Sequence, residues 1–135
     1  MEIEDNSSNR IQTEIKSLLD EFNQEKVGDD NHELITLSIS ESDELVAGLV
    51  GGTYWGYMYV DSLIVVKNRR NCGLGRALIL RAEQIALSKG CEHATIDTHD
   101  FQGFEFYLKL DYKIIGKLPD LPQGNFKYHL YKKLK

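Results

Sequence analysis

The residues most able to do chemistry lie between an apolar segment and a long amphipathic one. Residues 67–76 read KNRRNCGLGR, so three arginines surround Gly73 and Gly75. The preceding SLIVV (residues 62–66) predicts a buried strand, and apolar residues at helical spacing predict a helix over about 74–88. The start of a helix carries unpaired N–H groups and a partial positive charge, and glycine lets a ligand approach the backbone closely. The segment therefore predicts a site for an anion such as phosphate, with an ordinary strand–helix turn as the competing interpretation.

Two common nucleotide-binding motifs do not fit this segment. GxGxxG lacks its third glycine, because Arg76-Ala77-Leu78 follows Gly75, and GxxxxGK[ST] lacks its Lys-Ser or Lys-Thr pair. What remains is an R-x-x-G-x-G pattern over Arg70–Gly75, between the predicted strand and the predicted helix.

A second group of residues, Asp100–Tyr112, reads DFQGFEFYLKLDY. Its spacing predicts an amphipathic helix over 101–110 with Asp100 as the cap, and it places Gly103 and Tyr107 one turn apart on one face. Taken alone, Tyr107 would be one more core aromatic residue.

The rest of the chain predicts the elements that must position these two groups. Alternating and apolar runs predict strands over 33–40, 45–53, 57–66, 93–98, 112–117 and 126–134, and a short edge strand over 1–5. A helix over about 8–24 has one apolar face and is expected to pack on a sheet. The glycines Gly48, Gly51 and Gly52 inside one strand predict a bulge or a close approach. This order predicts an α/β fold of the mixed α+β kind, with helices on both faces of a mixed sheet.

Composition narrows the class of protein. A length of 135 residues fits a single domain over residues 1–135, and 41% hydrophobic with 27% charged residues is typical of a soluble globular chain. A net charge of −5 disfavours nucleic acid as a partner, and no apolar run is long enough to span a membrane. Two cysteines, Cys72 and Cys91, and four scattered histidines form no disulfide framework and no metal-ligand spacing. We therefore expect a cytoplasmic protein without a metal.

The two groups occur in the order and at the separation of motifs A and B of the GNAT superfamily of N-acetyltransferases. Arg70–Gly75 resembles motif A, Q/R-x-x-G-x-G/A, and Asp100–Tyr112 resembles motif B, N-x-x-A-x-x-F-Y-x-K-x-G-F. Asn71 and Asp111 stand where members commonly have glycine, and both residue types accept positive φ. From about Leu45 onward the chain is similar to small bacterial single-domain members. Their C-terminal run is here Phe106-Tyr107, Tyr112, Pro122-Gln123-Gly124 and Lys127-Tyr128.

The resemblance implies a central mixed, mostly antiparallel, twisted sheet of six to seven strands with helices on both faces. It also implies that acetyl-coenzyme A (acetyl-CoA) is the co-substrate, in a V-shaped opening between the strand ending at Val66 and the strand beginning near His93. The backbone amides of Leu63 and Val65 would hold the pantetheine arm and polarise the thioester carbonyl. The residues expected to contact acetyl-CoA are Leu63, Ile64, Val65, Arg70, Asn71, Cys72, Gly73, Leu74, Gly75, Arg76, Asp100, Gly103, Phe104, Tyr107 and Lys109.

The chemistry implied by the resemblance is direct attack of an amine on the thioester, without a covalent enzyme intermediate. Tyr107 is the candidate general acid that protonates the leaving thiolate. Asp61 is the candidate general base, although a carboxylate there could equally orient a cationic substrate, and a chain of waters could take the proton.

The expected acceptor is a primary amine of a small molecule, because the short N-terminal region leaves little material for a peptide-binding groove. Two alternatives stay open: acetylation of a protein or peptide amine, and a non-catalytic acyl-CoA-binding or regulatory module. Tyr107 favours catalysis over the second. Many members are dimers, so a homodimer is expected, while the sequence does not identify the acceptor.

Overall fold

A computed structural model describes all 135 residues and divides them into two compact units, Met1–Asn31 and His32–Lys135. The first unit contains α1 (Asn9–Val27), which begins where the side chain of Ser8 accepts a hydrogen bond from the Ile11 N–H at 3.3 Å. The predicted helix is therefore confirmed, three residues longer at its end. Its packing on a sheet stays a prediction, as does the single domain. The predicted edge strand over 1–5 is wrong, because these residues form no strand and are exposed.

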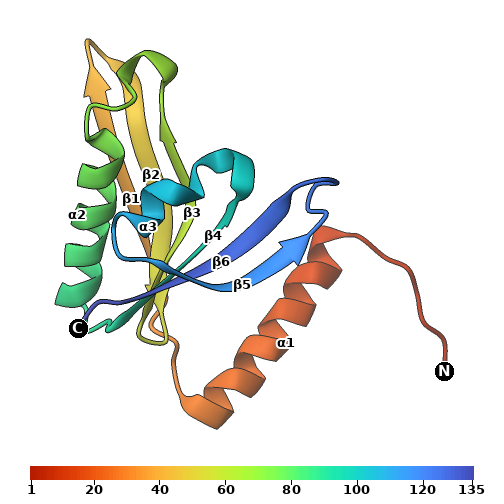
Figure 1. The fold of residues 1–135 in the computed structure, drawn as a ribbon. Helices are drawn as coiled ribbons and strands as arrows, with labels where there is room; N and C mark the ends of the chain where they lie inside the picture. The colour runs from red at the N-terminus through yellow and green to blue at the C-terminus, as the bar shows by residue number, and fades with distance from the viewer. The chain divides into compact units, whose positions relative to one another are not determined.

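The second unit is built on a six-stranded sheet in the order β1-β2-β3-β4-β6-β5 (Figure 1). Neighbouring strands are antiparallel except for β3 and β4, which are parallel. The mixed, mostly antiparallel sheet that the sequence predicted is thus confirmed, and so is the meander of its first three strands. The strands are β1 (Glu33–Glu41), β2 (Glu44–Tyr54), β3 (Tyr57–Val65), β4 (His93–His99), β5 (Lys113–Pro119) and β6 (Phe126–Lys133).

The parallel pairing of β3 with β4 stops early. Only Tyr57–Val60 pairs with His93–Ile96, although β3 continues to Val65 and β4 to His99. Beyond these pairs the two halves of the sheet spread apart, as Figure 1 shows. The structure therefore contains the V-shaped opening that the sequence led us to expect between these two strands.

A β-bulge in β3 lies at the apex of this opening. Val50 of β2 pairs with Ser62, but Gly51 pairs with Val60, so Asp61 is the extra residue. A Cβ atom at Gly51 would lie 2.2 Å from the Tyr59 carbonyl oxygen, a distance that no side chain tolerates. The sequence predicted a bulge or a close approach at the clustered glycines, and the structure shows both, with the extra residue on β3 and not on the glycine-containing β2. The bulge sets the direction of Asp61.

The core lies between the sheet and α2 (Leu74–Ser88), which runs along β1, β2 and β3 in Figure 1. Its buried members include Ala47, Leu49, Met58, Ile96 and Leu130 from the sheet and Leu78, Ile79, Ala82 and Ala86 from α2. None of the helices is long and apolar enough to cross a membrane.

The helix predicted over 101–110 is wrong in its details. The structure has a 3-10 turn at Asp100–Gln102 and a short helix α3 (Phe104–Leu108), separated by Gly103 at φ 74° and ψ 44°. A glycine adopts this left-handed conformation at little cost, and it interrupts the helix. Asp100 does not cap a helix; its Oδ2 accepts the N–H of Phe126 at 3.1 Å, which fixes the start of β6.

Candidate active site

The loop between β3 and α2 presents backbone donors at its end. Asn71 has φ 63° and Gly73 has φ 81°, so the chain turns sharply into α2, and the positive φ expected of Asn71 is observed. No side chain caps α2, and its first backbone hydrogen bond runs from Ala77 N to Gly73 O at 3.0 Å. The N–H groups of Leu74, Gly75 and Arg76 have no partner in the chain, so they can receive an anion.

The arginines of this loop divide into two roles. The Nε of Arg70 donates to the Val65 carbonyl at 3.0 Å, and Arg69 forms an ion pair with Glu41 of β1 at 2.9 Å. Both side chains therefore fasten the loop to the sheet. Arg76 is exposed on the first turn of α2 without an ion pair, so it is the arginine best placed to meet an anion there. The other two predicted loop contacts, Cys72 and Leu74, are exposed and half-buried respectively.

The free edge of β3 directs two amides into the opening. Val66 N donates to Val46 O of β2 at 2.9 Å, and in an antiparallel pair every second residue faces the same neighbour. The N–H groups of Leu63 and Val65 therefore point away from β2, where β3 has no strand partner. Ile64 alternates with them, so its N–H faces β2 and only its side chain, which is exposed, could meet a ligand.

The two sequence motifs meet at Gly75. A Cβ atom at Gly75 would lie 3.2 Å from the ring of Phe106, so the absence of a side chain lets α3 pack against the start of α2. Phe104 stacks on Tyr128 of β6 with ring centroids 4.5 Å apart. Gly103 faces open space and Lys109 is exposed. The contact between Gly75 and Phe106 therefore fixes α3 against the loop that connects β3 to α2.

Tyr107 lies on the core side of the opening. It is 7% exposed and packs edge-on against the rings of Phe106 and Tyr112. Burial raises the pKa of Tyr107 to about 12, so its phenol stays neutral across the physiological range. The hydroxyl makes no hydrogen bond within the chain, which leaves it able to donate one to a ligand.

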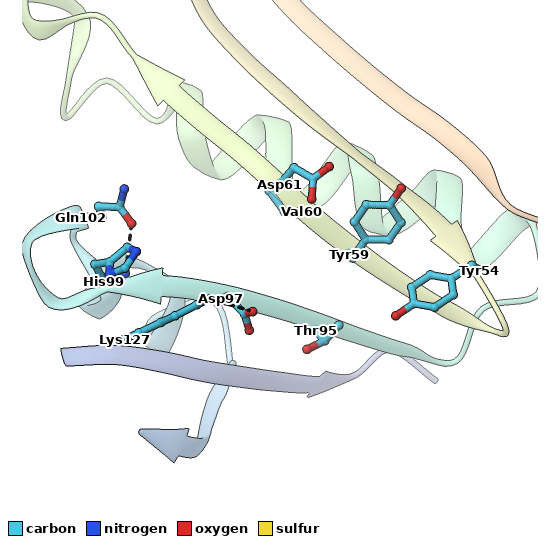
Figure 2. Close-up of a pocket in the computed structure, with 9 residues that line it drawn as sticks. All are labelled: Tyr54, Tyr59, Val60, Asp61, Thr95, Asp97, His99, Gln102 and Lys127. Atoms are coloured by element: carbon cyan, nitrogen blue, oxygen red, sulfur yellow. Dashed lines mark hydrogen bonds and ion pairs between the residues drawn. The ribbon is translucent and has the colours of Figure 1, made fainter. Parts of the chain in front are cut away.

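On the opposite face of the sheet, a cavity of about 670 Å³ opens along β3 and β4 (Figure 2). Figure 2 shows His99 and Gln102 at one end, Tyr54 at the other, and Asp61 and Asp97 between them. The nine residues that line it are Tyr54, Tyr59, Val60, Asp61, Thr95, Asp97, His99, Gln102 and Lys127. The structure therefore brings the predicted Asp61 into a cavity, and it keeps Tyr107 out of that cavity.

Sequence reasoning missed most of this wall. Thr95, Asp97 and His99 alternate along β4, so they share one face of the strand. That alternation was visible in the sequence. What it could not show is the parallel register that places Asp97 beside Asp61, each directly after the last paired residues Val60 and Ile96.

The two carboxylates of the cavity differ in their surroundings. Asp97 is held by His129, whose Nδ1 lies 2.8 Å from Oδ1, and by Lys127, whose Nζ lies 3.7 Å from Oδ2. Asp61 has neither an ion pair nor a hydrogen bond from another side chain. Burial, followed by the charge of Asp61 and the neighbouring Tyr54, raises the pKa of Tyr59. The cavity thus keeps one uncompensated negative charge, which favours a cationic ligand.

Known proteins resemble this chain along most of its length. Residues 3–112 match the sequence model of the acetyltransferase (GNAT) family. A blasticidin-S acetyltransferase of Streptomyces morookaense is 39% identical over 100 residues, which are 73% of this chain and 74% of that protein. The crystal structure of an acetyltransferase from Bacillus cereus ATCC 14579 superposes with a TM-score of 0.91 at 26% identity, covering 98% of this chain and 97% of that one. An aminoglycoside 6′-N-acetyltransferase complexed with coenzyme A shares the fold, with a TM-score of 0.68 at 22% identity, covering 98% and 95% of the two chains.

Proposed function

This chain belongs to the acetyltransferase (GNAT) family and is an N-acetyltransferase, and we propose that it moves the acetyl group of acetyl-CoA to a primary amine of a small molecule. The observation that carries the proposal is the opening between β3 and β4. Unpaired backbone donors of β3 and α2 line one side of it, and an acidic cavity lies on the other.

The donors on the first side suit the two ends of acetyl-CoA. The free N–H groups at the start of α2, together with Arg76, suit its pyrophosphate. The N–H of Leu63 or Val65 would polarise the thioester carbonyl as negative charge develops on its oxygen, and one such donor is typically worth roughly 3 kcal/mol of barrier. The coenzyme A in the solved aminoglycoside acetyltransferase supports this choice of co-substrate. Tyr107 is proposed to stabilise the leaving sulfur by a hydrogen bond from its hydroxyl, which has no partner within the chain.

The cavity on the second side suits a cationic amine. Its uncompensated carboxylate, Asp61, is proposed as the residue that meets the ammonium group of the acceptor, as its counter-ion or as the base that removes its proton. The relative from Streptomyces morookaense is named for blasticidin S, so blasticidin S is the first acceptor to test.

Acetyl-CoA is expected to raise the midpoint of thermal unfolding. A ligand at 100 times its dissociation constant adds about 2.7 kcal/mol, which in a domain of this size corresponds to roughly 5 °C or more. Arg76→Glu places a negative charge at the free N–H groups and should reduce that shift strongly. Arg81→Glu makes the same change further along the exposed side of α2 and should preserve it. Equal shifts with ATP and acetyl-CoA, or none with either, would contradict the proposed co-substrate.

Asp61→Asn is expected to lower kcat/KM for blasticidin S by about 10- to 100-fold, because an interaction with a charged group is worth roughly 1.5–3 kcal/mol. A rise in KM alone would identify Asp61 as the counter-ion, whereas loss of kcat and of the acidic limb of the pH profile would identify it as the base. The matched control is Asp43→Asn in the turn between β1 and β2, which should leave both constants unchanged. Unchanged kcat/KM in Asp61→Asn would remove this residue from the proposed site.

Two further parts of the proposal concern the cellular compartment and the oligomeric state of the enzyme. The free thiols Cys72 and Cys91 fit a reducing compartment, so we place the enzyme in the cytoplasm. We also propose a homodimer, by analogy with the family, and light scattering of the purified protein measures its mass directly.

A further inference from the structure

The acceptor cavity extends well beyond the place where the acetyl group is transferred. Leu63 and Val65, the proposed carbonyl-binding residues, lie past Val60, the last residue of β3 that pairs with β4. Tyr54 pairs with Tyr57, three residues before Val60, so its backbone lies about 10 Å along β3 from that residue. Figure 2 accordingly shows Tyr54 at one end of the cavity. An acceptor that fills the cavity therefore has a second group besides its reacting amine.

Three neighbours fix the ring of Tyr59 at this end of the cavity. Gly52 is its partner on β2, and a Cβ atom there would lie 2.5 Å from the Tyr59 hydroxyl oxygen, so the phenol extends across the backbone of a glycine. His32 contacts the same hydroxyl at 2.6 Å, and its ring is stacked on that of Tyr59 with centroids 5.9 Å apart. Tyr54 meets the ring edge-on, with centroids 5.5 Å apart and an interplanar angle of 76°. The position of the Tyr59 ring is thus set before any ligand binds.

Tyr54 and Tyr59 together form an aromatic corner, the name used here for the near right angle between their two rings. Both residues line the cavity, and Tyr54 is 37% exposed. Neither belongs to the buried core between the sheet and α2. The adjacent Trp55 lies against Tyr54 with ring centroids 5.7 Å apart, but it does not line the cavity. The corner therefore offers aromatic surface to a ligand and not to the core.

The corner suits a cation better than a flat ring. The faces of aromatic rings carry negative potential, and they attract a cation within about 6 Å of the ring centroid. A flat group stacks on only one of two perpendicular rings, whereas a compact ammonium group contacts both. Asp61, which has no ion pair, lines the same cavity and adds negative charge. Lys127, the only lysine or arginine in the cavity wall, is paired with Asp97.

We propose that Tyr54 and Tyr59 bind a second cationic group of the acceptor, at a distance from the amine that is acetylated. This inference rests on the proposed function and narrows its acceptor class to amines that carry two positive charges on an extended chain. Asp61 stays with the amine that reacts, next to the opening. The two tyrosines determine specificity. Because they contact a part of the acceptor that does not change during the reaction, their loss raises KM and leaves kcat nearly unchanged.

The test uses the full-length protein with acetyl-CoA and two amines, hexamethylenediamine and hexylamine, which share a chain length and differ by one ammonium group. We expect the diamine to have the higher kcat/KM. Tyr54→Leu should lower this preference by about 3- to 30-fold, as for a cation that loses an aromatic face, and it should do so through KM. Tyr54→Phe keeps the ring and should retain the preference. Trp55→Leu changes the adjacent exposed aromatic residue and should leave the preference unchanged.

A change of less than threefold in Tyr54→Leu would overturn the assignment. So would an equal loss with both amines, because the corner would then be an apolar contact. Failure of acetyl-CoA to raise the midpoint of the wild type would instead overturn the proposed function.

The fluorescence of Trp55, the only tryptophan of the chain, decides if neither amine is acetylated or if Tyr54→Leu does not fold. Its ring lies 5.7 Å from that of Tyr54, so it reports on the corner without turnover. A saturable change in the wild type with hexamethylenediamine, and none with hexylamine, supports the proposal. Equal responses to the two amines, or no response to either, contradict it.

Discussion

Glu83→Ala is expected to lower the free energy of unfolding by about 3–5 kcal/mol, the range measured when one partner of a buried charge pair is removed. Glu83 is a buried carboxylate of α2. It accepts the hydroxyl of Tyr112 at 2.8 Å and the ammonium of Lys132 at 2.9 and 3.1 Å. The substitution leaves an ammonium that is 17% exposed without its counter-ion. Thermal or urea unfolding should show the loss, with a midpoint lower by about 10–20 °C.

Two further variants distinguish the loss of the ion pair from the effect of placing alanine in α2. Gln84→Ala changes the adjacent exposed position of α2 and should leave the midpoint within a few degrees. Replacing both Glu83 and Lys132 by leucine removes the pair as a unit, and buried pairs replaced in this way often regain their stability. The double variant should therefore be more stable than Glu83→Ala. If Glu83→Ala were as stable as the wild type, water would have to solvate the ammonium of Lys132, and the predicted cost of an unpaired buried charge would be wrong.

Tyr107→Phe is expected to lower kcat by about 100-fold or more with little change in the KM for acetyl-CoA. The hydroxyl of Tyr107 has no partner in the chain, so its removal should leave the unfolding midpoint unchanged. A phenol whose pKa is about 12 remains a donor beside the developing thiolate. Complete proton transfer from it to a thiol of ordinary pKa, about 8.5, would be uphill. The hydroxyl therefore acts chiefly by hydrogen bonding to sulfur as charge develops there.

Tyr112→Phe is the matched control for this prediction, because it removes the hydroxyl of the neighbouring tyrosine. The two tyrosines touch, but the hydroxyl of Tyr112 is bonded to Glu83. Burial, and then the charge of Glu83, raise the pKa of Tyr112. Tyr112→Phe should lower the midpoint while kcat stays near that of the wild type. If Tyr112→Phe lowered kcat and Tyr107→Phe lowered only the midpoint, Tyr112 would be the residue that contacts the sulfur and Tyr107 the structural one.

Because Tyr107 stays protonated below about pH 12, its ionisation should cause no loss of rate up to pH 10.

Local patterns in the sequence were enough to predict most elements of the sheet. Alternation and turn residues located the strands, and the glycines before Tyr54 located the bulge, because these signals act over a few residues. The left-handed φ values at Asn71 and Asp111 also follow from residue type. Gly103 was visible as well, yet the helical spacing of the apolar residues around it was given more weight than its tendency to interrupt a helix.

The rest depends on pairings between distant segments. The cavity wall requires the register of β3 on β4, and the position of the His99 ring depends on a carbonyl 22 residues later in the chain. Glu83 looked like an ordinary polar residue of an amphipathic helix until β6 brought Lys132 beside it. Contacts between segments so far apart in the chain cannot be predicted from composition and spacing.

The opening in the sheet also bears on aggregation. Unpaired strand edges are templates on which other chains can add a strand. Here the two inner edges diverge from one apex, and only residues 61–65 of β3 and 97–99 of β4 lie beyond their pairing. Short free edges limit strand addition, which is one of the ways in which native proteins protect the edges of their sheets. The enzyme can therefore offer backbone donors to a small ligand inside its sheet while the free edges within the opening stay short.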